Sequence, residues 1–114
     1  MSFTTWLSGL FAKPYRTIGA AEAQELQRGG AILLDVREKH EWQAGHAPKA
    51  RHIPLGQLSA RSAELPAGRA VVTVCQSGMR SAQAARFLAT QGREVANLSG
   101  GMNAWSRAGL PVTR

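Results

Sequence analysis

Apolar and polar positions divide this chain into short and long segments that alternate along its length. Short apolar runs, several of them rich in β-branched residues, predict buried strands, and longer segments with apolar positions at helical spacing predict helices. The predicted strands span 15–18, 31–36, 52–53, 70–74 and 94–98. The predicted helices span 20–28, 37–44, 57–64, 82–90 and 102–107. Such an alternation favours an α/β fold, with a mainly parallel sheet flanked by helices on both faces.

The first residues have a pattern of their own. Their apolar positions recur at the spacing of one helix face and are Phe3, Trp6, Leu7 and Leu10. We therefore expect residues 1–14 to form an amino-terminal arm with a short amphipathic helix, and residues 15–114 to form one domain. The arm can dock on its own domain, pair two copies as a dimer or contact a membrane surface. No segment approaches the ~18 consecutive apolar residues of a membrane span.

The net charge and the cysteine content limit the kinds of binding partner and the cellular compartment that we expect. The 14 Lys and Arg residues outnumber the 7 Asp and Glu residues, which gives a net charge of +7 that attracts small anions and acidic protein surfaces. The basic residues are scattered, without a run or interleaved aromatic residues, so we do not expect nucleic-acid binding. One cysteine forms no internal disulfide, and the amino-terminal residues lack the charged region and cleavage site of a secretory signal. We expect a cytoplasmic protein.

The single cysteine, Cys75, directly follows the predicted strand 70–74. The residues between this strand and the next predicted helix are Cys75, Gln76, Ser77, Gly78, Met79, Arg80 and Ser81. In a tight turn at this place the backbone N–H groups point inward, and the helix directs its positive end at the same point. This environment lowers the pKa of a thiol and favours the reactive thiolate. The pattern predicts an anion-binding loop with a nucleophile at its base.

Further residues support or flank this loop. Gly78 supplies the positive φ that an inward-facing turn needs. Arg80 is expected to close the loop with its guanidinium or to steer the anion, the alternative being a helix residue that faces solvent. Asp35 and Arg37 follow another strand and lie at the same sheet edge. Asp35 is expected to accept hydrogen bonds or pair with an arginine, and Arg37 is open between a site and a scaffold role. Glu41 can pair with Arg37 or face solvent, and we expect it to face solvent.

The histidines and tryptophans predict structural rather than metal-binding roles. His40, His46 and His52 are evenly spaced, but a spacing of six residues matches no metal-ligand pattern. We therefore expect no metal and no cofactor, and we expect His46 to hold a loop by hydrogen bonds. Trp42 and Trp105 are expected to be core residues.

Six motifs occur in an order that resembles the rhodanese family of sulfurtransferases, over residues 15–112. They are Leu34–Arg37, Glu41–Trp42, Gly45–Pro48, His52–Leu55, Cys75–Ser81 and Gly100–Trp105. The resemblance implies a five-stranded parallel sheet and the transfer of sulfane sulfur through a persulfide on Cys75. It also implies that Gln76 to Arg80 surround this sulfur and that Asp35 and Arg37 lie near it. The implied donor is thiosulfate or a persulfide, and the implied acceptor is a thiol, cyanide or a protein.

One departure and two alternatives remain at this point. Members of the family that use thiosulfate often carry basic residues directly after the cysteine, whereas Gln76 and Ser77 are uncharged here. A rhodanese-like binding module without catalysis is the first alternative. A cysteine phosphatase or arsenate reductase is the second. Those enzymes have a longer loop than the four residues between Cys75 and Arg80, and a histidine where Val74 precedes the cysteine.

Overall fold

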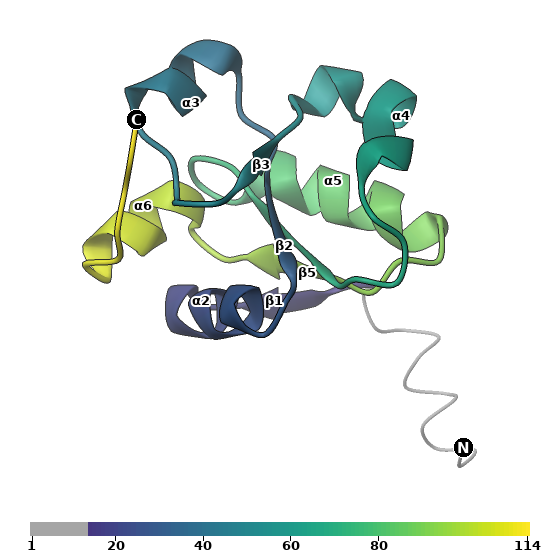
Figure 1. Cartoon of the computed structure of the whole chain (residues 1–114), viewed down its shortest axis with the longest axis horizontal. Helices are drawn as coiled ribbons and strands as arrows, with labels where there is room; N and C mark the ends of the chain where they lie inside the picture. The colour runs from purple at the N-terminus through teal and green to yellow at the C-terminus, as the bar shows by residue number, and fades with distance from the viewer. Residues whose placement is uncertain (1–13) are drawn as a thin grey trace.

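The protein is built on one five-stranded parallel sheet in the order β1-β5-β4-β2-β3 (Figure 1). The computed structural model describes residues 14–114. Its strands are β1 Arg16–Ile18, β2 Ile32–Asp35, β3 Arg51–His52, β4 Val71–Val74 and β5 Val95–Leu98. The sheet confirms the predicted α/β class and its five strands, and each pairing between neighbouring strands is parallel. All residues of β2, β4 and β5 are buried, as continuous apolar runs covered on both faces require.

Helices cover both faces of the sheet (Figure 1). They are α2 Ala20–Arg28, α3 Lys39–Ala44, α4 Leu58–Arg61, α5 Met79–Thr90 and α6 Gly101–Arg107. Successive strand residues point to opposite faces, so each strand contributes to two cores. The core beneath α4 and α5 includes Leu34, Leu58, Val71, Leu88 and Val95. The core beneath α2 and α6 includes Ala23, Leu33, Val72, Leu98 and Trp105.

The prediction of one continuous helix over residues 57–64 is wrong. The segment forms a 3-10 turn at Leu55–Gln57, the four-residue helix α4, and a second 3-10 turn at Ser62–Glu64. The backbone N–H of Gln57 donates to the carbonyl of Pro54 at 2.8 Å, and that of Leu65 donates to Ser62 at 3.1 Å. Such tighter turns satisfy the terminal groups of a short helix, and the segment is too short for more than one α-turn between them.

Two further helices begin at other residues than expected. The helix predicted at 37–44 begins at Lys39, because Glu38 is its N-cap in a capping box: the Glu38 backbone N–H donates to the Glu41 carboxylate at 3.0 Å. The helix predicted at 82–90 begins at Met79, and its first bond joins the Ala82 N–H to the Gly78 carbonyl at 3.2 Å. Met79 and Arg80 therefore belong to the first turn of α5 and not to the preceding loop.

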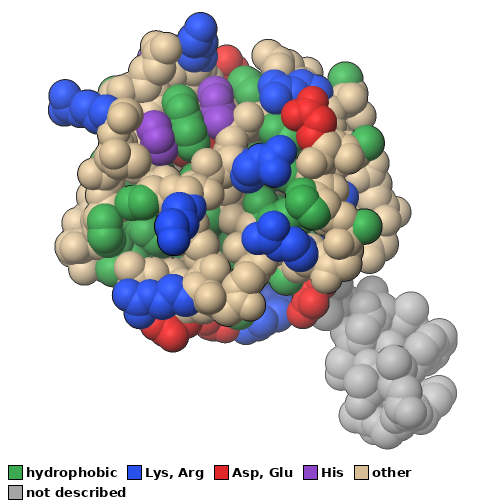
Figure 2. Space-filling view, in the orientation of Figure 1, with side chains coloured by type: hydrophobic (Ala, Val, Ile, Leu, Met, Phe, Trp, Pro, Cys, Tyr) green, Lys and Arg blue, Asp and Glu red, His purple; other side chains and the backbone are tan. Residues whose placement is uncertain are grey.

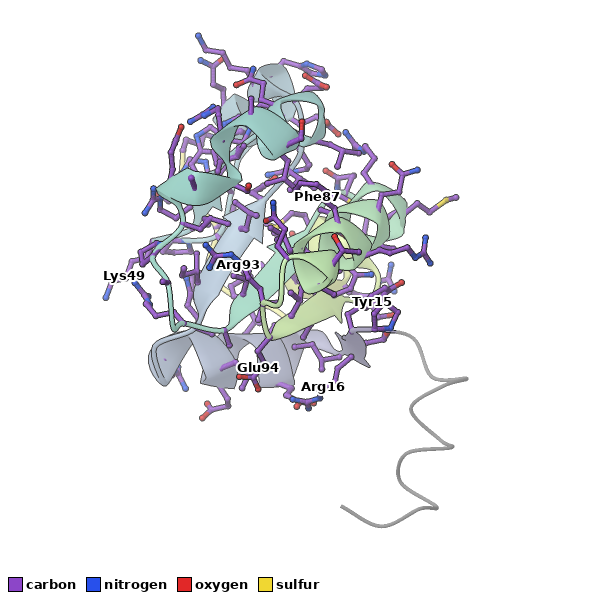
Figure 3. The ribbon with its side chains drawn as sticks, turned by 90° about the vertical axis from the view of Figure 1, so that its right-hand side faces the viewer. Tyr15, Arg16, Lys49, Phe87, Arg93 and Glu94 are labelled. Carbon is purple, nitrogen blue, oxygen red and sulfur yellow. The ribbon has the colours of Figure 1, made fainter. Side chains whose placement is uncertain are left out.

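The register of the sheet brings the predicted functional residues to one edge. Asp35 is paired with Val74 in the β2–β4 ladder, so the residues that follow both strands leave the sheet side by side. Arg93 lies near the opposite, amino-terminal ends of the strands, in the turn between α5 and β5 (Figure 3). Its guanidinium donates to the carbonyls of Leu65 and Pro66 at 2.7 and 3.0 Å. The predicted functional residues thus lie at the carboxyl ends of the strands, away from the contacts of Arg93.

Two sequence-based expectations concern the ends of the chain and the membrane. The predicted amino-terminal helix, and the dimer contact proposed for it, lie on residues outside those that the structure describes. Among the described helices, none combines the length and the apolar character that crossing a membrane requires.

Candidate active site

Cys75 lies at the junction of β4 and the loop before α5. Its Sγ accepts hydrogen bonds from the Gly78 backbone N–H at 3.1 Å and from the Ser81 hydroxyl at 3.3 Å. Gly78 has a φ of 110°, as the prediction of a positive φ required, and it caps the amino terminus of α5. Cys75 is buried, with 1% of its surface exposed. The sulfur therefore lies on the floor of the loop, beneath the first turn of α5.

Opposing effects act on the pKa of Cys75. Burial raises the pKa of the thiol, because desolvation disfavours the charged form. Hydrogen bonds from the Ser81 hydroxyl and from the backbone N–H groups of Ser81, Gly78 and Ser77 lower it, and together they prevail. The pKa of Cys75 thus lies below its usual value. The positive end of α5 acts in the same direction.

Helix α6 packs directly against the backbone of this loop. The Met102 N–H donates to the Cys75 carbonyl at 2.8 Å, and the Asn103 N–H donates to the Gln76 carbonyl at 3.1 Å. Gly101 permits the approach, since a Cβ at this position would lie 2.2 Å from the Cys75 carbonyl oxygen. Sequence reasoning did not identify Asn103 as a neighbour of the site, because its contact depends on how α6 packs. The Gly100–Gly101 pair was the available signal.

Arg37 has contacts both to a buried carboxylate and to the loop after Cys75. Arg37 is 3% exposed, and its guanidinium pairs with the fully buried Asp35 through Nε and Nη2, the latter at 2.8 Å. Nη2 also donates to the Gly45 carbonyl at 2.7 Å, and Nη1 donates to Gln76 Oε1 at 3.0 Å. Gln76 Nε2 in turn donates to Asn103 Oδ1 at 2.6 Å. Asp35 and Arg37 are therefore a buried scaffold that holds the first loop residue.

The guanidinium of Arg80 is paired with a carboxylate of α3. Its Nη1 and Nη2 donate to the two carboxylate oxygens of Glu41 at 2.6 and 2.8 Å, so helix α5 is joined to α3. The expectation that Glu41 faces solvent is wrong, because its carboxylate has this bidentate partner. The hydrogen bond from Arg80 is the main cause that lowers the pKa of Glu41 to about 2, and the backbone of Glu38 adds to it against the effect of burial.

The remaining predicted loop residues are brought to the same place with different exposures. Gln76 and Gly78 are half-buried, whereas Ser77 and Met79 are exposed, Met79 to 79%. None of these four side chains is charged. An anion at the loop therefore meets backbone N–H groups, the end of α5 and hydroxyl groups, and meets the guanidinium of Arg80 only in its pair with Glu41.

The aromatic and imidazole side chains near the site have structural contacts. Trp105 is 1% exposed and is a core residue, as expected. Trp42 is half-buried instead, and its ring stacks with His46 at 3.5 Å and with His52 at 4.8 Å between centroids. His46 Nδ1 also lies 2.8 Å from the Trp42 carbonyl, which holds the loop after α3. Within residues 14–114 no three His, Cys, Asp or Glu side chains gather in a way that could hold a metal ion.

Comparisons with known proteins agree with this arrangement. A sulfurtransferase of Allochromatium vinosum is 43% identical over 82 residues, which are 71% of this chain and 77% of that protein. An HTH-type transcriptional regulator of Mycobacterium tuberculosis is 39% identical over 106 residues, which are 90% of this chain and 47% of the regulator, so the chain spans about half the length of that relative. A solved structure of a rhodanese-related protein from Thermoplasma volcanium has a TM-score of 0.81 at 32% identity, over 87% of this chain and 98% of that one.

The family model that matches is described as the rhodanese-like domain, and it covers residues 19–108. This range includes Asp35 and Arg37, the Cys75 loop and the part of α6 that packs on it. Relatives named as sulfurtransferases share about 40% of their aligned residues with this chain. The sheet, the cysteine loop and these similarities together show that the chain belongs to the rhodanese-like domain family.

Proposed function

We propose that this protein is a sulfurtransferase in which Cys75 carries the transferred sulfur as a persulfide. The observation that carries the proposal is the pair of hydrogen bonds that Cys75 Sγ accepts from the Gly78 N–H and the Ser81 hydroxyl. These donors stabilise a thiolate, which is the nucleophilic form of cysteine. Membership of the rhodanese-like family and the relatives named as sulfurtransferases support the same reaction class.

The reaction takes place in two steps, and in each step one bond to the transferred sulfur forms while another breaks. In the first step the Cys75 thiolate attacks the outer sulfur of the donor, a new S–S bond forms, and the leaving group departs with the electron pair of the broken bond. The leaving group is sulfite from thiosulfate or a thiolate from a persulfide. In the second step a thiolate or cyanide attacks the terminal sulfur of Cys75, and the Cys75 thiolate is the leaving group.

The loop stabilises both resting states of such an enzyme. The thiolate and the persulfide each carry one negative charge, and the same N–H groups and the end of α5 face both. A thiol that is already ionised requires no side-chain base, and Val74 precedes Cys75 where a base would stand. Since only 1% of Cys75 is exposed, the donor presents its outer sulfur as a single protruding atom.

This chemistry indicates the chemical classes of the sulfur donor and the sulfur acceptor. The donor is a small sulfur-bearing anion, and the acceptor is a thiol, cyanide or a thiol of another protein. We place the reaction in the cytoplasm, where thiols stay reduced and Cys75 remains available.

The test is the intact mass of the protein after incubation with a donor. We expect thiosulfate or an organic persulfide to add one sulfur atom, cyanide to remove it, and Cys75→Ser to gain none. Because Cys75 is the single cysteine, this variant is a complete control. No gain from any donor would favour the binding module without catalysis. Release of phosphate from an aryl phosphate in a parallel incubation would favour the phosphatase.

A further inference from the structure

The side chains that surround the Cys75 loop carry almost no net charge of their own, although the protein as a whole is strongly basic. Arg80 is the one charged residue in the segment from Cys75 to Ser81, and its guanidinium is engaged by both oxygens of Glu41. The other ion pair at this edge, Arg37 with Asp35, is buried and likewise balanced. The loop therefore lies between two neutralised pairs.

Glu41 is a fixed partner for Arg80 and not a passing one. Its carboxylate accepts the Glu38 backbone N–H at the start of α3, and its side chain is 20% exposed. The low pKa of Glu41, about 2, keeps the carboxylate ionised throughout the neutral range. The pKa of Arg80 is raised, mainly by its hydrogen bonds to Glu41 and to a smaller extent by the charge of Cys75. Arg80 follows Cys75 by five residues, in the first turn of α5, and its charge is already compensated by Glu41.

We propose that the Glu41–Arg80 pair determines the charge of the sulfur donor, so that the site prefers donors with one negative charge, such as organic persulfides and thiosulfonates, to the dianion thiosulfate. The inference rests on the proposed function, whose substrate class it narrows. A donor approaches a thiolate that is itself negative, and the helix end offers only about half a positive charge. A second charge on the donor finds no unpaired cation among these residues of the loop and its two flanking pairs.

Thiosulfate and methanethiosulfonate form a matched pair of donors. In both cases the Cys75 thiolate attacks the outer sulfur, the bond from that sulfur to the sulfonyl sulfur breaks, and the leaving group departs with the electron pair. Sulfite leaves thiosulfate as a dianion, and methanesulfinate leaves methanethiosulfonate as a monoanion. Both reactions give the same persulfide, so the change in the ratio of their kcat/KM values from one variant to another reports the effect of the additional charge on the donor.

Glu41→Gln tests the proposal, because glutamine retains an oxygen that can accept the Glu38 N–H while the pair gains a positive charge. We expect the thiosulfate-to-methanethiosulfonate ratio of kcat/KM to rise about five- to tenfold, the size of one screened charge interaction at short range. The matched control is Glu25→Gln, which changes the net charge equally and breaks the exposed Arg28–Glu25 pair on α2. Its ratio should stay at the wild-type value.

Two more variants separate electrostatics from a loss of structure. Arg80→Gln leaves the pair with a negative charge and should lower the ratio, whereas the double variant Glu41→Gln/Arg80→Gln is neutral and should return it near the wild-type value. If the Glu41–Arg80 pair had a structural role only, the variants would lower the kcat/KM values of both donors, and the ratio would not follow the charge of the pair. Absence of sulfur loading from either donor would overturn the proposed function itself. Loading at a ratio that is the same in all variants would leave that function intact and overturn the charge selection.

Discussion

At the scale of single residues, the reactivity of Cys75 depends on which of two opposing effects is larger. Burial favours the neutral thiol, and several hydrogen bonds favour the thiolate, with the hydroxyl of Ser81 the largest of them. Ser81 is fully buried, and its carbonyl accepts a hydrogen bond from the Thr73 hydroxyl at 2.9 Å. The donor to the sulfur is therefore held in place by a residue of β4. A hydrogen bond to a charged group is worth about 1.5–3 kcal/mol, enough to decide the protonation state.

The first prediction at this scale concerns Ser81→Ala. Removal of the hydroxyl should raise the pKa of Cys75, because a donor to the thiolate is lost while burial is unchanged. The measurement is the rate of alkylation by iodoacetamide as a function of pH. Ser59→Ala, on the exposed surface of α4, is the control and should leave the midpoint unchanged. A wild-type midpoint at or above about 8.5, the value of a free cysteine, would contradict a stabilised thiolate.

Residue by residue, the local conformation of the loop was easier to predict from the sequence than the contacts between distant residues. Cys75 and Gly78 were identifiable because a strand, a turn and a helix follow one another locally, and each leaves a pattern. The pairing of Arg80 with Glu41 was not, because the two residues lie 39 positions apart and their contact depends on how α3 and α5 are placed. Trp42 was misjudged for a related reason, since its stacking with two histidines requires the loop after α3 to fold back.

At the scale of elements, the loop is fixed by three neighbours. Cys75 directly follows strand β4, the N-cap and first turn of helix α5 supply N–H groups, and helix α6 contacts the loop backbone. Gly78 and Gly101 are placed where these elements approach one another, and a side chain at either position would contact neighbouring backbone. The order of the elements was predictable from periodicity. The only sequence signal for the close approach of α6 was the glycine pair at its start, Gly100 and Gly101.

The prediction at this scale compares Gly78→Ala with Gly30→Ala. Both glycines have a φ of 110°, so both variants should lose about 1–2 kcal/mol of stability from the left-handed backbone. A Cβ at Gly78 would also lie 3.2 Å from the Gly100 backbone nitrogen, whereas a Cβ at Gly30 has open space around it. We expect sulfur transfer to fall about a hundredfold in Gly78→Ala, because a backbone shift would move the N–H of residue 78 away from the sulfur, and to be unchanged in Gly30→Ala.

Thermal unfolding and sulfur transfer, measured on the same samples, separate the two effects. Equal losses of stability with unequal losses of transfer would attribute the difference to the loop. Equal losses of both would show that backbone strain alone accounts for the result. Retention of transfer by Gly78→Ala would show that the loop keeps its geometry, and its N–H at the sulfur, with a side chain at this position.

At the scale of the whole molecule, the electrostatic field and the local site act differently on an anion. The net charge of +7 is spread over the surface, and the face in Figure 2 shows basic side chains that are dispersed and interrupted by acidic ones. Such a field attracts anions at long range, more strongly the more charge they carry. The pairs at the loop are neutral, so we expect any discrimination between donors to take place after this approach.

The last prediction follows from this separation of approach and selection. Added salt should lower the second-order rate of sulfur loading from methanethiosulfonate severalfold between about 10 mM and about 500 mM, because screening shortens the reach of the protein's field. The decrease should be steeper for thiosulfate, which carries two charges. Alkylation of Cys75 by the uncharged iodoacetamide is the control at the same sulfur and should change little. If alkylation fell in parallel, salt would be acting on the thiolate itself, and long-range attraction would play no part in donor capture.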